Sequence, residues 1–136
     1  MTAPRYLLDT NICIYIAKHN PPEVRQHFIL HPHEHLAMSV ITLGELRHGA
    51  EKSQFREKSV KVLSKLIEVI QVLEIPVEVG VCYGQIRAEL EKKGQIIGNN
   101  DLWIAAHALS SGLILVTNNV REFSRIETLK IENWAI

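Results

Sequence analysis

Four polar side chains in this chain are placed so that their oxygen atoms could meet in one site: Asp9, Glu45, Asp101 and Asn119. Asp9 directly follows residues 6–8 (Tyr-Leu-Leu), a short apolar run typical of a strand buried on both faces of a parallel sheet. A carboxylate at the carboxyl end of such a strand lies where open α/β sheets bind ligands. Asp also caps helices well, so this stretch alone equally favours Asp9 as the cap of the next helix.

The other three side chains are expected at the same edge of the sheet. Asn119 lies just past a second apolar run, residues 113–116, and Asp101 opens the helix that leads into that run. Glu45 falls in the early turns of a helix that follows a further predicted strand. Spacing alone leaves other roles open, because Asp101 could only cap its helix and Glu45 could only pair with His48 or Arg47 on the surface.

Carboxylates gathered in one crevice repel one another and raise one another's pKa unless a cation offsets their charge. An oxygen-only donor set, without paired Cys or His, points to a hard ion, Mg²⁺ with Mn²⁺ as a substitute, rather than to zinc. Such an ion is usually held by one or two carboxylates, waters and substrate phosphate oxygens. Two ions about 3.5–4 Å apart would clamp an in-line displacement at phosphorus. The segment 31–35 (His-Pro-His-Glu-His) has a metal-binding composition, but its Pro favours a solvated loop.

Strands alternate with helices along the whole chain, which predicts an α/β fold with a parallel sheet and helices on both faces. The expected strands are 6–8, 36–39, 70–75, 113–116 and an edge strand at 130–133. The expected helices are 12–18, 23–30, 40–52, 54–69, 77–93, 102–109 and 120–123. No linker, repeat or low-complexity segment divides the chain, so residues 1–136 are expected to form one domain.

The composition excludes several classes of protein. Fifteen basic and fifteen acidic residues cancel, so no overall basic field would attract nucleic acid, and any such binding must use a local patch or a partner. Cys13 and Cys82 lie among apolar residues, as buried thiols do in a reducing compartment. No apolar run reaches membrane-spanning length and no signal pattern opens the chain, which predicts a cytoplasmic protein without membrane contact.

Several motifs carry a resemblance to a known family. They are residues 7–11 (LLDTN), 39–50 (SVITLGELRHGA), 97–108 (IGNNDLWIAAHA), 115–123 (LVTNNVREF) and 131–134 (IENW). In this order they closely resemble the PIN-domain ribonuclease toxins of the VapC type, over essentially the full length.

The resemblance implies a compact PIN-like α/β domain that cleaves RNA endonucleolytically with Mg²⁺ and so inhibits translation. It further implies a VapB-type antitoxin that blocks the site, DNA binding only through that antitoxin, and a homodimer. Asp9, Glu45 and Asp101 match the family's acidic metal-holding positions. A fourth family position, often Asp, falls on Asn119, which can accept a hydrogen bond or ligate but brings no charge, so one firmly held ion is expected. A tRNA loop is the expected target.

These roles form one hypothesis for the mechanism. Asp9 and Asp101 would bind the ion directly, and Glu45 would hold a water or take its proton. Thr10 or Asn11, together with Asn119, would orient waters and phosphate oxygens. Glu89 is expected on a solvated helix face. The cations available for RNA are Arg47, Arg87, Lys92, Lys93, Arg121 and Arg125, each of which could equally be a solubilising surface charge.

Three other interpretations remain. A structure-specific DNA nuclease would keep the same site, but the chain lacks an insertion that could thread DNA. A module that sequesters RNA or its antitoxin without turnover would explain the missing fourth acid. An aspartyl-phosphate enzyme would need a second Asp two residues after the first, where this chain has Asn11. Trp103 could stack on a base, although the Ala-rich helix around it favours a core or subunit contact.

Overall fold

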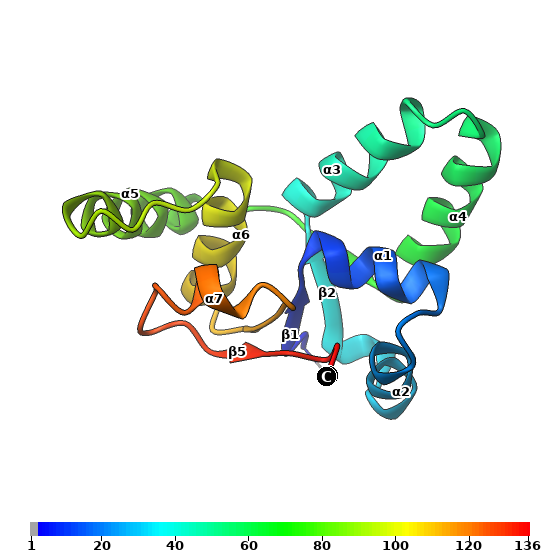
Figure 1. Cartoon of the computed structure of the whole chain (residues 1–136), viewed down its shortest axis with the longest axis horizontal. Coiled ribbons are helices and arrows are strands. Elements are labelled where there is room, and N and C mark those ends of the chain that lie inside the picture. Colours follow the sequence, from blue (N-terminus) through cyan, green and yellow to red (C-terminus); the bar gives the residue numbers. More distant parts are fainter. Residues whose placement is uncertain (1–2) are drawn as a thin grey trace.

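The computed structural model describes residues 3–136, and its centre is a sheet of five parallel strands (Figure 1). The strands are β1 (Tyr6–Leu8), β2 (Leu36–Ser39), β3 (Gln71–Leu73), β4 (Ile114–Val116) and β5 (Ile131–Glu132). Their order is β3-β2-β1-β4-β5, with Tyr6 opposite Leu36 on one side and opposite Ile114 on the other. The first strand is therefore central, and the chain reverses its winding direction there.

Helices cover both faces of the sheet. They are α1 (Thr10–Lys18), α2 (Pro22–Leu30), α3 (Val40–Glu51), α4 (Arg56–Val69), α5 (Val77–Lys92), α6 (Asn99–Ser110) and α7 (Val120–Phe123), with a short 3₁₀ turn at His33–His35. In Figure 1, α5, α6 and α7 lie on one side of β1, and α1, α2 and α4 lie on the other. None of the helices in residues 3–136 is long and apolar enough to cross a membrane.

The alternation of side chains along β1 divides the interior into two apolar clusters. Leu7 packs with Leu115 and the Ala-rich stretch of α6, whereas Leu8 packs with Ile12 of α1 and Leu66 of α4. Because successive side chains of a strand point to opposite faces, a run without polar residues is what a strand with helices on both faces requires.

The predicted fold class is confirmed, and the differences lie at the ends of elements. The third strand is shorter than predicted. The first helix begins at Thr10 rather than at residue 12, because Asp9 caps it. The sixth begins at Asn99, so Asp101 lies inside its first turn and is not its cap, which is Gly98. Cys13 is buried as predicted, whereas Cys82 is only half-buried.

Candidate active site

Asp9 occupies the centre of the site because the central strand ends there. Its backbone N–H donates to the carbonyl of Val116 at 3.0 Å, which holds the ends of β1 and β4 together. Its Oδ1 accepts from the N–H of Ile12 at 2.9 Å, and the side chain is 5% exposed. The capping role is thus real. It also fixes a carboxylate at the carboxyl edge of the sheet.

Burial makes Asp9 an unusual carboxylate. Desolvation raises its pKa to about 6, against hydrogen bonds from Thr117 and from the Ile12 N–H that lower it. The negative charges of Asp101 and Glu45 raise that pKa further. Burial and the charge of Glu45 likewise raise the pKa of Asp101. Residues separated by more than ninety positions therefore act on one another electrostatically, as the sheet-edge argument predicted.

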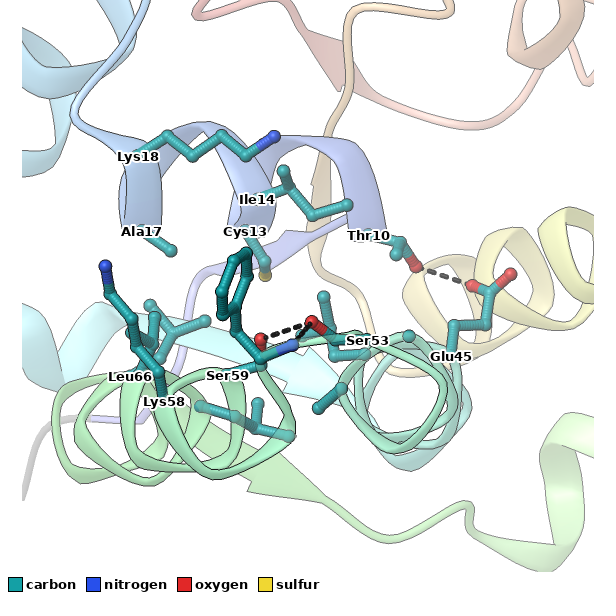
Figure 2. A pocket seen from close by; sticks show the side chains of 16 residues that line it. Thr10, Cys13, Ile14, Ala17, Lys18, Glu45, Ser53, Lys58, Ser59 and Leu66 are labelled. Atoms are coloured by element: carbon teal, nitrogen blue, oxygen red, sulfur yellow. Dashed lines mark hydrogen bonds between the residues drawn. The ribbon is translucent and has the colours of Figure 1, made fainter.

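Glu45 is held in place from two other helices. The Thr10 hydroxyl at the start of α1 donates to Glu45 Oε1 at 2.5 Å, a bond drawn in Figure 2. The Asn100 amide, in the first turn of α6, donates to Glu45 Oε2 at 3.4 Å. The Thr42 hydroxyl, one turn before Glu45 on α3, lies 3.3 Å from the Thr10 hydroxyl and can donate to it, because the single Thr10 proton is given to Glu45. Three elements therefore converge on this carboxylate and orient it.

Asn119 follows β4 as predicted and is half-buried. Its backbone N–H donates to the Thr117 hydroxyl at 2.9 Å, which folds the turn after β4 back on itself. Its side chain does not cap α7. Asn11 is exposed. Glu89 lies outside the site, as expected, because it is 66% exposed and pairs with Lys93 on its own helix.

Three neighbours of the carboxylates were not assigned roles from the sequence. Thr117 is fully buried and bonds to Asp9, and Asn100 bonds to Glu45. Glu122, in the first turn of α7, is close enough to Asp101 for its charge to raise the pKa of that side chain. All three lie within three positions of predicted site residues in the sequence, and that closeness is the signal that could have found them.

The donor set suits a hard cation. Oxygen atoms of three carboxylates face this edge, and none of the ion pairs among residues 3–136 involves Asp9, Glu45 or Asp101. A cation would offset the repulsion that raises the pKa of Asp9 and Asp101. Within the described part of the chain, no three Asp, Glu, His or Cys side chains are gathered closely enough to hold one ion together. One or two carboxylates with water, the usual Mg²⁺ arrangement, is therefore the fit that the residues allow.

Most of the cations considered for RNA binding have partners within the chain. Arg47 pairs with Glu51 at 2.7 Å, and Arg87 pairs with Glu91 at 3.4 Å. Arg125 donates to the carbonyl of Ile96 at 2.9 Å. Trp103 stacks on Tyr83 at 3.8 Å between ring centroids, and it packs on the core as its Ala-rich surroundings indicated.

An apolar groove of about 640 Å³ runs between α1, α3 and α4 (Figure 2). Its walls include Leu46 of α3 and Val62 of α4. Thr10 and Glu45 lie at the end of the groove near the carboxylates, whereas Lys18 and Lys58 lie toward its other end. Apolar clefts of this size commonly bind ligands or peptide segments.

Comparison with known proteins supplies the family context. Residues 6–129 match the PIN domain. The chain is 44% identical over 130 residues to ribonuclease VapC2 of Haemophilus influenzae, covering 96% of this chain and 98% of that protein. It is 44% identical over 131 residues to the tRNA(fMet)-specific endonuclease VapC of Shigella flexneri, with the same coverage.

Solved structures of VapBC complexes have a similar fold to this chain. The DNA-bound VapBC structure from Salmonella typhimurium superposes with a TM-score of 0.91 at 44% identity, covering 96% of this chain and 98% of that one. VapBC2 from Rickettsia felis, bound to a fragment of its promoter DNA, superposes with a TM-score of 0.89 at 40% identity, covering 95% and 98%.

Proposed function

The chain belongs to the PIN-domain family and, within it, to the VapC ribonucleases, and on this premise we propose that it is the toxin of a toxin–antitoxin pair. As such it cleaves RNA endonucleolytically, inhibits translation, and is blocked by a VapB-type antitoxin. The single observation that supports this best is the convergence of Asp9, Glu45 and Asp101 from β1, α3 and α6 at one edge of the sheet. We propose that it acts in the cytoplasm, where its proposed substrate, RNA, is found.

Mg²⁺ is the proposed cofactor, with Asp9 and Asp101 as its ligands. When bound, the ion would supply Lewis-acid polarisation of the phosphodiester and lower the pKa of the attacking water. Asp9 is pre-oriented for this role by the Ile12 N–H and the Thr117 hydroxyl. Glu45, held by Thr10 and Asn100, is the residue that would take the proton of the attacking water. Asn119 would orient a phosphate oxygen or a water.

A tRNA is the proposed substrate class. The S. flexneri relative is named a tRNA(fMet)-specific endonuclease, and the two chains correspond over nearly their whole length. Single-stranded loops leave both the sugar-phosphate backbone and the base edges free to contact a protein, so a loop is the proposed part of the tRNA.

The apolar groove is the proposed seat of the antitoxin. The solved relatives are VapBC complexes, so a surface for a partner chain is expected. The groove ends at Thr10 and Glu45, so a segment lying along it would cover Glu45 at the edge of the active site. Lys18 and Lys58 beside the apolar walls favour a segment that combines apolar and acidic side chains. DNA would then be bound through the antitoxin.

The test is cleavage of total cellular RNA, and of a purified initiator tRNA, by antitoxin-free protein with Mg²⁺ or with a chelator. Asp9→Asn and Asp101→Asn should each lower the rate by more than about a hundredfold, because each removes several kcal/mol of transition-state stabilisation. The matched control is Glu89→Gln, which replaces an exposed carboxylate that pairs with Lys93 outside the site, and this variant should cleave normally. RNA binding by wild type without any metal-dependent product would instead support the sequestering module.

A further inference from the structure

A second hollow, of about 530 Å³, lies along α1 and reaches Asn118 in the turn after β4. Tyr15, Lys18, Asn20 and Asn118 contribute its polar groups, and Ile14, Pro21 and Ala135 contribute apolar surface. Its volume is within the range of about 300–1,000 Å³ found for ligand sites. It is separate from the apolar groove between α1 and α4, although Lys18 and Ile14 border both.

The chain connects this hollow directly to the carboxylates. Asn118 stands between Thr117, which bonds to Asp9, and Asn119. The α1 helix runs from the Asp9 cap to Lys18, a length of about 13.5 Å at a rise of about 1.5 Å per residue. About three or four nucleotides cover that length at the spacing of about 3.4 Å per nucleotide in a stacked strand. A strand that is cut at Asp9 would therefore reach this hollow.

Three of these polar groups match the parts of a nucleotide: Lys18, Tyr15 and Asn118. Lys18 is exposed, and it takes part in none of the ion pairs among residues 3–136, so its charge is available for a phosphate. Figure 2 shows its side chain running back along α1 over Ile14, toward the end of the helix at which Thr10 lies. The ammonium group is thus directed along the path from the carboxylates.

Tyr15 supplies an aromatic surface. Its ring packs against the buried cluster that contains Trp134, and it is only half-buried where it borders the hollow. The Asn118 amide donates to the Tyr15 hydroxyl at 2.9 Å, which holds the ring in place and leaves the amide oxygen as an acceptor. A partly exposed aromatic ring beside a cation is an arrangement on which single-stranded bases stack.

From these observations we propose that the hollow is a nucleotide-binding subsite for the RNA strand, about three or four nucleotides from the bond that is cut. Lys18 contacts a phosphate, Tyr15 stacks on a base, and Asn118 holds the ring and accepts from a base amino group. The inference rests on the proposed function and adds the part of the substrate outside the reacting bond. It also explains how a chain without net positive charge binds RNA, since one unpaired cation and one ring supply local affinity.

Binding is measured first, by fluorescence anisotropy with a labelled ten-nucleotide oligouridylate in a chelator, so that no cleavage intervenes. Lys18→Gln should weaken binding about fivefold and reduce the slope of log K against log salt by about 0.7, the loss of one phosphate contact on a single strand. Tyr15→Leu, which keeps apolar packing, should weaken binding about tenfold, while Tyr15→Phe, which keeps the ring but loses the hydroxyl held by Asn118, should weaken binding by less. Lys61→Gln, an exposed lysine of α4 outside both hollows, is the matched control.

Cleavage with Mg²⁺ then separates this inference from the proposed function. Lys18→Gln and Tyr15→Leu should raise KM and leave kcat within about threefold of wild type, because the contacts lie away from the reacting bond. If wild type cleaves RNA and both variants keep its KM and its oligouridylate affinity, the subsite is wrong while the nuclease stands. If Lys18→Gln weakens binding of the antitoxin but not of RNA, the hollow belongs to the protein interface and the proposal is overturned. If wild type cleaves nothing, the proposed function fails, and the anisotropy series alone decides the subsite.

Discussion

At the scale of single residues, the same interactions that fold the chain prepare its carboxylates for chemistry. Asp9 caps α1, joins β1 to β4 through its backbone, and still carries a charge that the interior disfavours. A group with an elevated pKa in a cleft, beside other carboxylates, is typical of a functional site. The molecule gives up stability at this position for the sake of the site.

Asp9→Asn should therefore stabilise the metal-free protein at neutral pH. The carboxyl pKa is about 6 in the folded chain against 3.8 when solvated, so the folded state binds more protons between these values and stability falls as pH rises through them. Asn keeps the cap but never ionises, so the gain should be on the order of 2–3 kcal/mol above pH 6 and vanish below about pH 4. Thermal unfolding with a chelator at both pH values measures it. An equal gain at low pH would mean that packing, not charge, is responsible.

Thr10→Val should reduce cleavage while leaving the fold intact. The Thr10 hydroxyl donates to Glu45, and without it the proposed proton acceptor loses one of the two groups that orient it. Groups that orient catalytic or ligating side chains typically contribute about 10–100-fold, so a loss in kcat of that size is expected. Thr128→Val, which removes an exposed hydroxyl elsewhere, is the control. Full activity of Thr10→Val would show that Glu45 needs no such support.

At the scale of elements, the apolar pattern predicted most boundaries because most of them coincide with the edges of apolar runs. The strands 6–8 and 36–39 are confirmed to the residue. The starts of α1 and α6 were missed by two to three residues, because their first turns contain Thr, Asn and Asp, which periodicity cannot distinguish from loop.

The residues that meet in the site could be predicted from the sequence, but the contacts that orient them could not. Strand ends predicted that Asp9, Glu45 and Asp101 would meet, because parallel strands bring their carboxyl ends to one edge. The contacts of Thr10, Asn100 and Thr117 depend on how α1, α3 and α6 are rotated about their axes, which the sequence pattern does not specify. The metal itself and the role of Asn119 stay predictions.

His107 joins three elements and should make the stability of the protein pH-dependent. Its Nδ1 lies 2.9 Å from the hydroxyl of Ser39, which ends β2 and caps α3, and burial lowers the pKa of the imidazole below 6.5. The unfolded chain takes up a proton at a pH at which folded His107 stays neutral. The neutral imidazole therefore makes its full contribution to the free energy of unfolding above pH 6.5. This contribution decreases as the pH falls toward the lower pKa that His107 has in the folded state.

Replacing His107 by Gln should thus destabilise the protein at pH 7.5, by about 1–2 kcal/mol for the altered buried hydrogen bond, and by less at pH 5. Denaturant unfolding at the two pH values measures the difference between wild type and variant. His48→Gln, an exposed histidine of α3, should show neither effect. A destabilisation that is equal at both pH values would contradict the assignment of a neutral, buried imidazole.

At the scale of the whole molecule, the proposed antitoxin groove shares α3 with the active site but has a wall, α4, that carries none of the three carboxylates. The carboxylates come from β1, α3 and α6, whereas the outer wall of the proposed antitoxin groove is α4. Inhibition and catalysis should therefore be separable by mutation. The zero net charge does not oppose self-association, and the homodimer stays a prediction that light scattering of the antitoxin-free chain would test.

Val62→Asp should produce a toxin that cleaves RNA but escapes its antitoxin. Val62 lies on α4 along the groove and is 41% exposed, so the substitution leaves the core clusters in place. An unpaired carboxylate against an apolar partner segment has to be desolvated, so antitoxin affinity should fall at least about tenfold, or about 1.4 kcal/mol.

Val81→Asp makes the same change on α5, where the valine is 64% exposed and outside the groove. With one equivalent of antitoxin, RNA cleavage should persist for Val62→Asp and stop for wild type and Val81→Asp. The reverse pattern would move the antitoxin interface from the α1–α3–α4 groove to the α5 side of the molecule.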